Sequence, residues 1–244
     1  MDDARETTLD ERLFERCEAV PADPPPGNYV VVDTMHFSNT VIELLANGAE
    51  HVHITDERGQ EFAYREANPR AVLGGSSTDA YEPAAGYDFF NSPSYVQDVD
   101  VAGRPVSMTS SNGGRAVTRL RDAPDVEVYV GSTMNAAAVA DRLRGAGETY
   151  LVSAGSRGEI AVEDLVGATL IGRRLDGHPV SAVERELFRR QLRTAKGPGY
   201  VDTHELRRRD VIEYAMAIDS REVVPRLEGA TLVDAARRGP PAAD

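Results

Sequence analysis

Short apolar runs alternate with segments of helical spacing along most of the chain. The run at residues 29–32 ends at Asp33 and is typical of a strand buried in a parallel sheet. Further strands are expected at residues 51–54, 71–75, 106–109, 127–131 and 149–153, and helices at residues 40–48, 57–66, 136–143, 181–194 and 204–217. This alternation predicts an α/β fold with three layers, α/β/α, and a mostly parallel sheet. It leaves open whether two interlocked subdomains share that sheet.

The pattern fades at both ends of the chain and once in its middle. Residues 1–27 are charged and then proline-rich, so they predict an N-terminal arm that either forms a short helix or attaches loosely. Residues 28–233 are expected to form the α/β domain, followed by a flexible tail at residues 234–244. Residues 76–100 lack periodicity, and a long irregular connection inside a compact domain is usually functional or disordered.

Small and polar residues follow the ends of several expected strands. In an open parallel sheet the carboxyl ends of the strands line one edge, where ligands bind. The residues at this edge are expected to be Asp33, Gly74, Asn112, Asn135 or its neighbour Ser132, and Ser156. Such residues can donate hydrogen bonds to phosphate oxygens, although Ser and Asn also simply cap helices. The convergence of several such turns favours an anion-binding site.

Residues 151–164 combine three features of a phosphate site. An apolar strand leads into a small-residue turn around Gly155, and the adjacent carboxylates Glu163 and Asp164 stand at the start of the next helix. Free amides at a helix N-terminus favour an anion, and carboxylate oxygens can hold a hard cation. The stretch is consistent with a metal-dependent phosphate site. An ordinary capped helix after a loop is the alternative that it leaves open.

Composition narrows the classes of partner. The formal net charge is −13 over 244 residues, and Lys196 is the only lysine, a composition associated with proteins of a high-salt cytoplasm. So acidic a chain repels nucleic acid and anionic membranes. Cys17 is the only cysteine, and no run approaches the ~20 apolar residues of a membrane span. A cytoplasmic protein without nucleic-acid or membrane partners is expected, and a homo-oligomer stays open.

Six motifs, taken in order, resemble the 2-phosphosulfolactate phosphatase family, a group of magnesium-dependent phosphatases with an α/β fold. They lie at residues 30–33, 86–93, 109–113, 131–136, 154–167 and 219–225. The resemblance spans residues 28–232, and the acidic composition would make the chain a divergent, haloarchaeal member. It implies a small anionic 2-phospho acid as substrate and Mg²⁺ as cofactor.

The resemblance also implies roles for individual residues. Catalytic residues are expected at Asp33, His36 and Ser92, and the metal ligands at Asp33, Glu163 and Asp164. Phosphate-binding residues are expected at Asn91, Asn112, Gly113, Asn135 and Gly155.

The chain departs from the family pattern at three places. His36 stands where the family has an arginine, Gly75 and Ser76 stand where it has a Gly-Glu-Arg turn, and Ser153 replaces a cysteine. Arginine pairs bidentately with phosphate, whereas histidine carries a charge only when protonated. His36 is therefore either a pH-dependent phosphate contact or a neutral loop residue. Two functions follow: a magnesium-dependent phosphatase, or a non-catalytic or repurposed relative that binds a metabolite.

Overall fold

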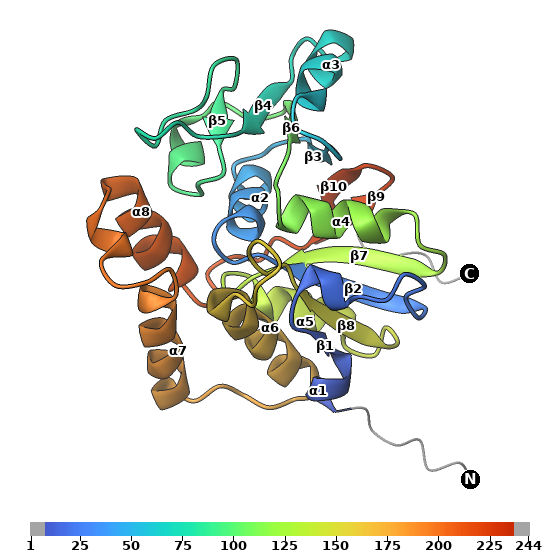
Figure 1. The fold of residues 1–244 in the computed structure, drawn as a ribbon. Helices are drawn as coiled ribbons and strands as arrows, with labels where there is room; N and C mark the ends of the chain where they lie inside the picture. The colour runs from blue at the N-terminus through green and yellow to red at the C-terminus, as the bar shows by residue number, and fades with distance from the viewer. Residues whose placement is uncertain (1–7, 237–244) are drawn as a thin grey trace.

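The computed structural model describes residues 8–236, and within them helices cover both faces of one sheet (Figure 1). The sheet has the order β1-β8-β2-β7-β9-β10-β3-β6-β4-β5. Its strands are β1 (Leu13–Phe14), β2 (Gly27–Val32), β3 (His51–Ile54), β4 (Val72–Gly75), β5 (Phe89–Phe90), β6 (Pro105–Met108), β7 (Val126–Gly131), β8 (Thr149–Ser153), β9 (Pro225–Glu228) and β10 (Thr231–Asp234). The helices are α1 (Leu9–Arg12), α2 (Phe37–Ala46), α3 (Gln60–Ala67), α4 (Gly113–Arg121), α5 (Ala136–Leu143), α6 (Val162–Leu175), α7 (Ala182–Thr194) and α8 (Glu205–Arg209). The predicted three-layer α/β/α fold with a mostly parallel sheet is confirmed.

The sheet consists of two parallel groups of strands joined by a hairpin. β1, β8, β2 and β7 form one group, and β3, β6, β4 and β5 form the other. The antiparallel hairpin β9–β10 lies between them, and it meets β7 only at the pair Tyr129 and Arg226. Figure 1 shows the second group above the first, with α2 between them. The junction between the two groups is where the candidate site lies.

Alternating residues of β2 divide the apolar core into two clusters. Tyr29 and Val31 pack on one face with residues of α2 and α4, and Val30 and Val32 pack on the other with residues of α5 and α6. All four side chains are fully buried. Full burial of a side chain of this size contributes about 1.5–3 kcal/mol. The continuous apolar run is therefore explained by helices on both faces of a parallel strand.

The N-terminal segment is part of the body wherever the structure describes it. β1 pairs in parallel with β8, through Leu13 opposite Leu151 and Phe14 opposite Val152. Cys17 is buried as well. The expectation of a loose arm is therefore corrected for residues 8–27, because apolar side chains anchor the segment to the sheet edge. Residues 1–7, and residues 237–244 of the expected tail, lie outside the described residues.

Two expected helices and one irregular segment differ in detail from the prediction. The helix expected at residues 204–217 is the short α8 followed by a π-helical stretch, η4 (Asp210–Ala215). α2 starts at Phe37, earlier than the apolar pattern indicated. The irregular residues 76–100 contain β5 and a 3₁₀ turn, η2 (Tyr95–Asp98), so part of this segment extends the sheet.

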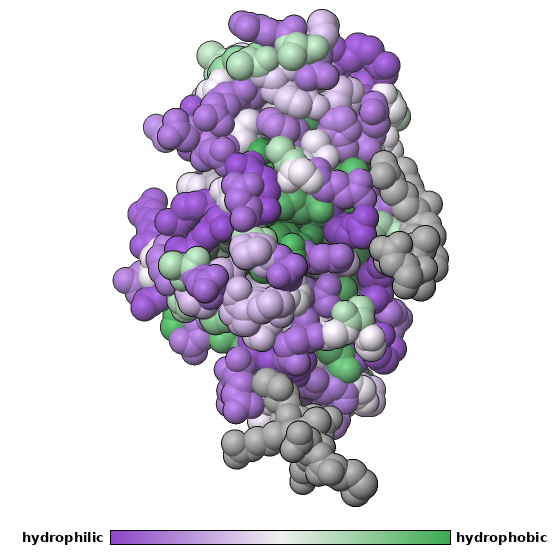
Figure 2. Space-filling view, turned by 90° about the vertical axis from the view of Figure 1, so that its right-hand side faces the viewer, coloured by the Kyte–Doolittle hydropathy of each residue, from purple (hydrophilic) through white to green (hydrophobic). Residues whose placement is uncertain are grey.

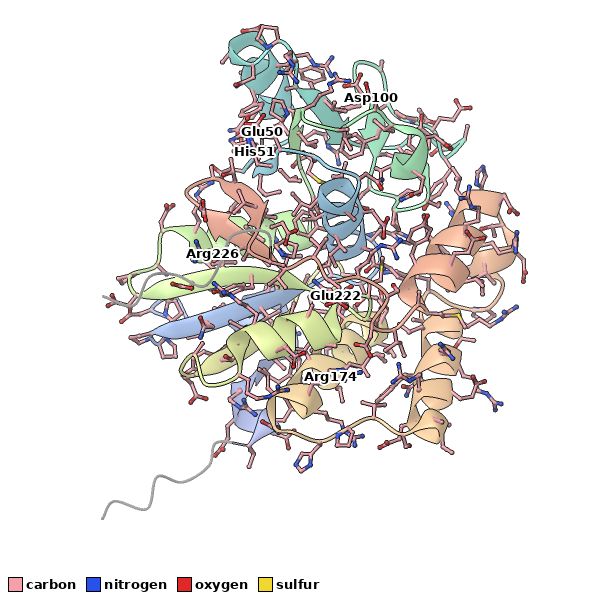
Figure 3. The ribbon with its side chains drawn as sticks, turned by 180° about the vertical axis from the view of Figure 1, so that it is seen from behind. Glu50, His51, Asp100, Arg174, Glu222 and Arg226 are labelled. Atoms are coloured by element: carbon pink, nitrogen blue, oxygen red, sulfur yellow. The ribbon has the colours of Figure 1, made fainter. Side chains whose placement is uncertain are left out.

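The molecular surface is largely polar, as the charge predicts. The face in Figure 2 is mostly hydrophilic, with apolar residues gathered in a hollow near its middle. Arginines form ion pairs on this surface: Arg174 of α6 pairs with Asp219 in the segment before β9, and Arg226 pairs with Glu228 of the same strand. Figure 3 labels both arginines. No helix within residues 8–236 combines the length and apolar character needed to cross a membrane.

Candidate active site

A polar cavity of about 360 Å³ opens at the junction of the two strand groups. The loops that line it follow the carboxyl ends of β2, β3, β4, β5 and β6, as expected for a ligand site in a parallel sheet. Its polar lining residues are Asp33, His36, Arg58, Ser76, Ser77, Tyr81, Asn91, Thr109, Ser110, Ser111, Asn112 and Tyr200. Hydroxyl and amide groups dominate this set, so the cavity suits a small ligand rich in oxygen atoms.

A second cavity near α8 is larger, at about 580 Å³, but suits an anion poorly. Asp88, Asp98 and Asp100 line it, against a single arginine, Arg104. These carboxylates would repel a phosphorylated ligand. The smaller cavity at the strand ends is therefore the better candidate.

The three predicted metal ligands meet beside this cavity although about 130 residues separate them in the sequence. Asp33, Glu163 and Asp164 are at most 4% exposed. The Asp33 carboxylate accepts a hydrogen bond from the amide of Gly113 at 2.9 Å, which joins the ends of β2 and β6. The chain folds so that like charges crowd at one point.

Asp164 organises the loops at this point. One of its carboxylate oxygens accepts a hydrogen bond from the Thr34 amide at 2.9 Å, and the other accepts one from the Gly155 amide at 3.1 Å. The side chain therefore fixes the loop after β2 to the loop after β8. The sequence left open that the acids at the start of α6 only cap the helix. Asp164 instead links the loops that follow two strands, β2 and β8.

Lys196 supplies the positive charge of the cluster, a role that the sequence analysis missed. Its ammonium group forms an ion pair with Glu163, and its side chain is only 26% exposed. The residue follows α7, far from the predicted site motifs. The sequence did contain one signal: Lys196 is the only lysine of a chain whose other Lys/Arg positions are all arginine. In the structure this lysine contacts a buried carboxylate.

The electrostatics of the cluster follow from burial. Burial raises the pKa of Asp33 to about 6, against the opposing effect of Lys196. Burial, and then the charge of Asp33, raises the pKa of Asp164 as well. Burial lowers the pKa of Lys196, but its pairing with Glu163 and the nearby aspartates overcomes this, so that the pKa is raised overall. One ammonium group thus faces three carboxyl groups, and the cluster favours a further positive charge.

The carboxylates are not all arranged as ligands of one ion. Among the described residues, no group of three or more His, Cys, Asp or Glu side chains is placed to hold a metal. Magnesium commonly binds through one or two carboxylates and takes its other ligands from water and from substrate phosphate. Asp33 and Glu163 provide hard oxygen donors of this kind, so the residues present fit a magnesium ion in that mode.

His36 is a neutral residue of the cavity wall. Burial lowers its pKa, although the charge of Asp210 acts in the opposite direction. Its Nε2 lies 3.1 Å from the hydroxyl of Tyr200, and its Nδ1 is buried without a partner among the described residues. The structure therefore does not supply a protonated histidine in place of the family's arginine.

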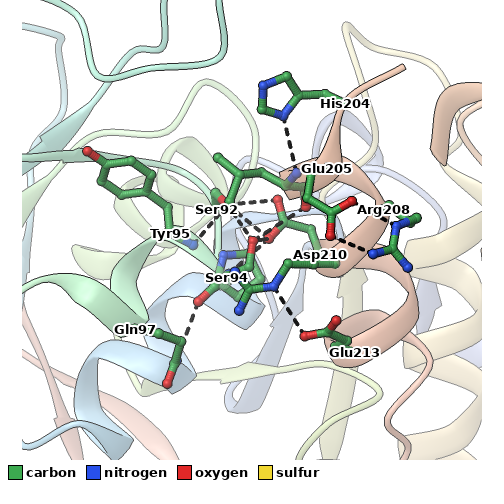
Figure 4. Close-up of polar contacts among 12 residues, drawn as sticks. Ser92, Ser94, Tyr95, Gln97, His204, Glu205, Arg208, Asp210 and Glu213 are labelled. Atoms are coloured by element: carbon green, nitrogen blue, oxygen red, sulfur yellow. Dashed lines mark hydrogen bonds and ion pairs between the residues drawn. The ribbon is translucent and has the colours of Figure 1, made fainter. Parts of the chain in front are cut away.

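Ser92 supports the cavity rather than lining it. Its hydroxyl donates to the carboxylate of Asp210, which also accepts a hydrogen bond from the amide of Ser94 at 2.9 Å (Figure 4). All three residues are fully buried. The next residue toward the cavity is Asn91, whose side-chain oxygen is buried without a partner. The Ser92–Asp210 network therefore holds the turn that presents Asn91.

The predicted phosphate-binding residues divide into two sets. Asn91 and Asn112 line the cavity, whereas Asn135 is fully buried elsewhere. The amide of Asn135 donates to the carbonyl of Val223 at 2.9 Å, so the structure does not bring it to a ligand. The amides of Gly113 and Gly155 bind carboxylates of the cluster. They organise the acids instead of facing the cavity.

The positions that depart from the family pattern also lie near the strand ends. Gly75 and Ser76 line the cavity, and the hydroxyl of Ser76 is buried without a partner. Ser153 ends β8, and its hydroxyl is likewise buried without a partner.

Fold and cavity together define an α/β protein with a polar candidate site at its strand ends. A family model described as 2-phosphosulpholactate phosphatase matches residues 15–230. The chain therefore belongs to the 2-phosphosulfolactate phosphatase family, which confirms the resemblance inferred from its motifs.

Individual relatives agree over most of the chain. A probable 2-phosphosulfolactate phosphatase of Gloeobacter violaceus is 30% identical over 226 residues, which cover 88% of this chain and 93% of the relative. Proteins of the same name from Symbiobacterium thermophilum and Thermoplasma acidophilum are 33% and 24% identical, over 70% and 80% of this chain and 76% and 84% of theirs.

Replacing Lys196 tests the charge balance of the cluster. Lys196→Met leaves Glu163 buried and unpaired, which should lower the free energy of unfolding by roughly 3 kcal/mol. The double variant Glu163→Gln/Lys196→Met should recover most of that loss. Arg190→Met, which breaks an exposed pair with Glu186, should cost less than about 1 kcal/mol. Urea unfolding compares them, and a Lys196→Met loss no larger than the control would contradict a buried pair.

A pH series tests the buried state of Asp33. Its pKa is raised in the folded chain, so the folded state binds more protons than the unfolded state between pH 3.8 and about 6. The contribution of this carboxyl to stability therefore falls as pH rises through that window. Asp33→Asn should stabilise the metal-free protein by up to about 3 kcal/mol at pH 7 and by little near pH 4. Asp122→Asn, an exposed carboxylate, controls for net charge, and a benefit independent of pH would exclude this cause.

Proposed function

We propose that the chain is a magnesium-dependent phosphatase that hydrolyses a small 2-phospho acid, such as 2-phosphosulfolactate to sulfolactate and phosphate. The observation that carries the proposal is the position of Asp33, a buried carboxylate that lines the cavity and belongs to the acid cluster. The names of the curated relatives support the substrate class.

The proposed metal contacts are Asp33 and Glu163. When bound, Mg²⁺ supplies positive charge that stabilises the phosphoryl oxygens and the leaving oxygen as charge develops on them. Asp164 holds the two loops around this position through its amide hydrogen bonds. Lys196 neutralises Glu163 while the site is empty of substrate and remains beside it as a second positive charge.

The cavity wall would orient the phosphate. Asn112 and Asn91 can donate from their amide groups. The ester P–O bond breaks as a nucleophile attacks phosphorus, either a water oxygen or a carboxylate oxygen of Asp33. In the second case water then hydrolyses the aspartyl phosphate, which releases phosphate and regenerates Asp33. In either case the departing oxygen takes up a proton. Both routes are compatible with the position of Asp33.

A metabolite-binding relative without phosphatase activity is the second candidate. The neutral, buried His36 favours it, because the position lacks the charge of the family's arginine. Lys196 and Arg58 favour the enzyme, since each places a cation at the cluster or the cavity from a different part of the chain. Under both functions the ligand is a small anion. A cytoplasmic location and the absence of nucleic-acid partners remain part of the proposal.

Phosphate release from 2-phosphosulfolactate tests the function directly. The purified protein should release phosphate with magnesium and lose at least 90% of that activity when the metal is removed by a chelator. Ligand-induced stabilisation without phosphate release would favour the metabolite-binding relative.

Magnesium titration tests the proposed contact at Asp33. Magnesium should raise the melting temperature of the wild type by mass action, because it binds the crowded carboxylates of the folded state. Asp33→Asn should remove this effect and nearly all turnover. Asp176→Asn, which removes a carboxylate at the opposite end of α6, should retain both. Equal magnesium affinities of the wild type and Asp33→Asn in calorimetry would falsify the metal assignment.

A further inference from the structure

Arg58 is the one charged group of the cavity whose role the proposed reaction does not use. It is the only lysine or arginine among the described residues that line the cavity, and Asp33 is the only carboxylate. Arg58 lies in the loop between β3 and α3. It makes no hydrogen bond or ion pair with any residue in the part of the chain that the structure describes. A cation in an acidic protein is thus left available to a ligand.

The topology places Arg58 and the acid cluster on different strand groups. Arg58 follows β3, and the cavity-lining Ser110 and Ser76 follow β6 and β4, the next two strands of the same group. Asp33 follows β2 in the other strand group. The cavity therefore joins a carboxylate end, where a metal and a phosphate can bind, to a cationic end lined by hydroxyl groups.

We propose that Arg58 binds a second acidic group of the substrate, a carboxylate or sulfonate, and thereby selects 2-phospho acids over simple phosphate esters. A guanidinium group pairs bidentately with such planar or trigonal oxyanions, and it keeps its charge at every physiological pH. With the phosphate at the Asp33 end, the second acid group reaches the other end of the same cavity. This inference rests on the proposed function for its substrate class.

The hydroxyl groups beside Arg58 fit the same ligand. Ser76 has a buried hydroxyl without a partner, and Ser77 and Ser110 line the same cavity, after the strands of the group to which β3 belongs. A sulfonate or carboxylate has more oxygen lone pairs than one guanidinium can satisfy, and hydroxyl donors complete its hydrogen bonds. Arg58 thus supplies the positive charge, and the serine hydroxyls supply directional hydrogen bonds that orient the acid group.

Three substrates separate this role from general support of the fold. 2-Phosphosulfolactate carries a carboxylate and a sulfonate, 2-phosphoglycolate carries a carboxylate alone, and p-nitrophenyl phosphate carries neither. Arg58→Met should reduce kcat/KM roughly 10- to 100-fold for a substrate with the matching acid, chiefly through KM, and less than about twofold for p-nitrophenyl phosphate. A loss on 2-phosphoglycolate assigns the carboxylate to Arg58, and a loss on 2-phosphosulfolactate alone assigns the sulfonate. Arg58→Lys should lose less than Arg58→Met.

Arg142→Met is the matched control. Arg142 also forms no hydrogen bond or ion pair with a described residue, but it lines a different cavity, so its replacement should leave all three substrates unchanged. An equal loss on all three substrates in Arg58→Met would overturn the inference while leaving the proposed phosphatase function intact.

If the wild type releases no phosphate, the proposed function fails. Sulfolactate binding then decides the inference: it stands if calorimetry detects binding to wild type that Arg58→Met loses, and is overturned otherwise.

Discussion

The burial of three carboxyl groups around one ammonium group is the constraint on which the site depends. Asp33 follows β2, Glu163 and Asp164 lie in the first turn of α6, and Lys196 joins the cluster from the segment after α7. Crowded like charges cost free energy, so the fold must hold these loops by other means. It does so with amide hydrogen bonds from Thr34, Gly155 and Gly113. The hydrogen bonds that hold the loops in place therefore also hold the carboxylates of Asp33 and Asp164 in position.

The same constraint explains the position of the cavity. The hairpin β9–β10 and strand β3 continue one sheet across two parallel groups, so loops from both groups meet at one edge. Asp33 stands on one side of that edge, and Arg58 on the other. The Ser92–Asp210 network holds the turn that presents Asn91 to the same cavity. A site for a ligand with two acidic ends follows from the joining of the two strand groups.

The local pattern of the sequence was sufficient for the α/β class and for most strands, because a continuous apolar run such as residues 29–32 has few alternatives to a buried parallel strand. The sequence also indicated that Asp33, Glu163 and Asp164 converge, because the carboxyl ends of parallel strands lie at one edge of the sheet. It could not reveal Lys196 at the site, because Lys196 follows a helix and only tertiary packing brings it there. Arg58 does follow the predicted strand at residues 51–54, but the loop after that strand carries none of the motifs from which the site was predicted. Asn135 was predicted as a phosphate contact on local pattern, but its amide binds a distant carbonyl that the sequence does not identify.

One cavity is proposed to bind the whole substrate, with a metal and phosphate at one end and a second acid group at the other. A crystal structure of the wild type with magnesium, sulfolactate and phosphate bound tests it most directly. In the wild type, we expect the metal against Asp33 and Glu163, the phosphate beside Asn112, and an acid group of sulfolactate against Arg58. Ligands bound outside this cavity, or a metal that contacts neither carboxylate, would contradict the account.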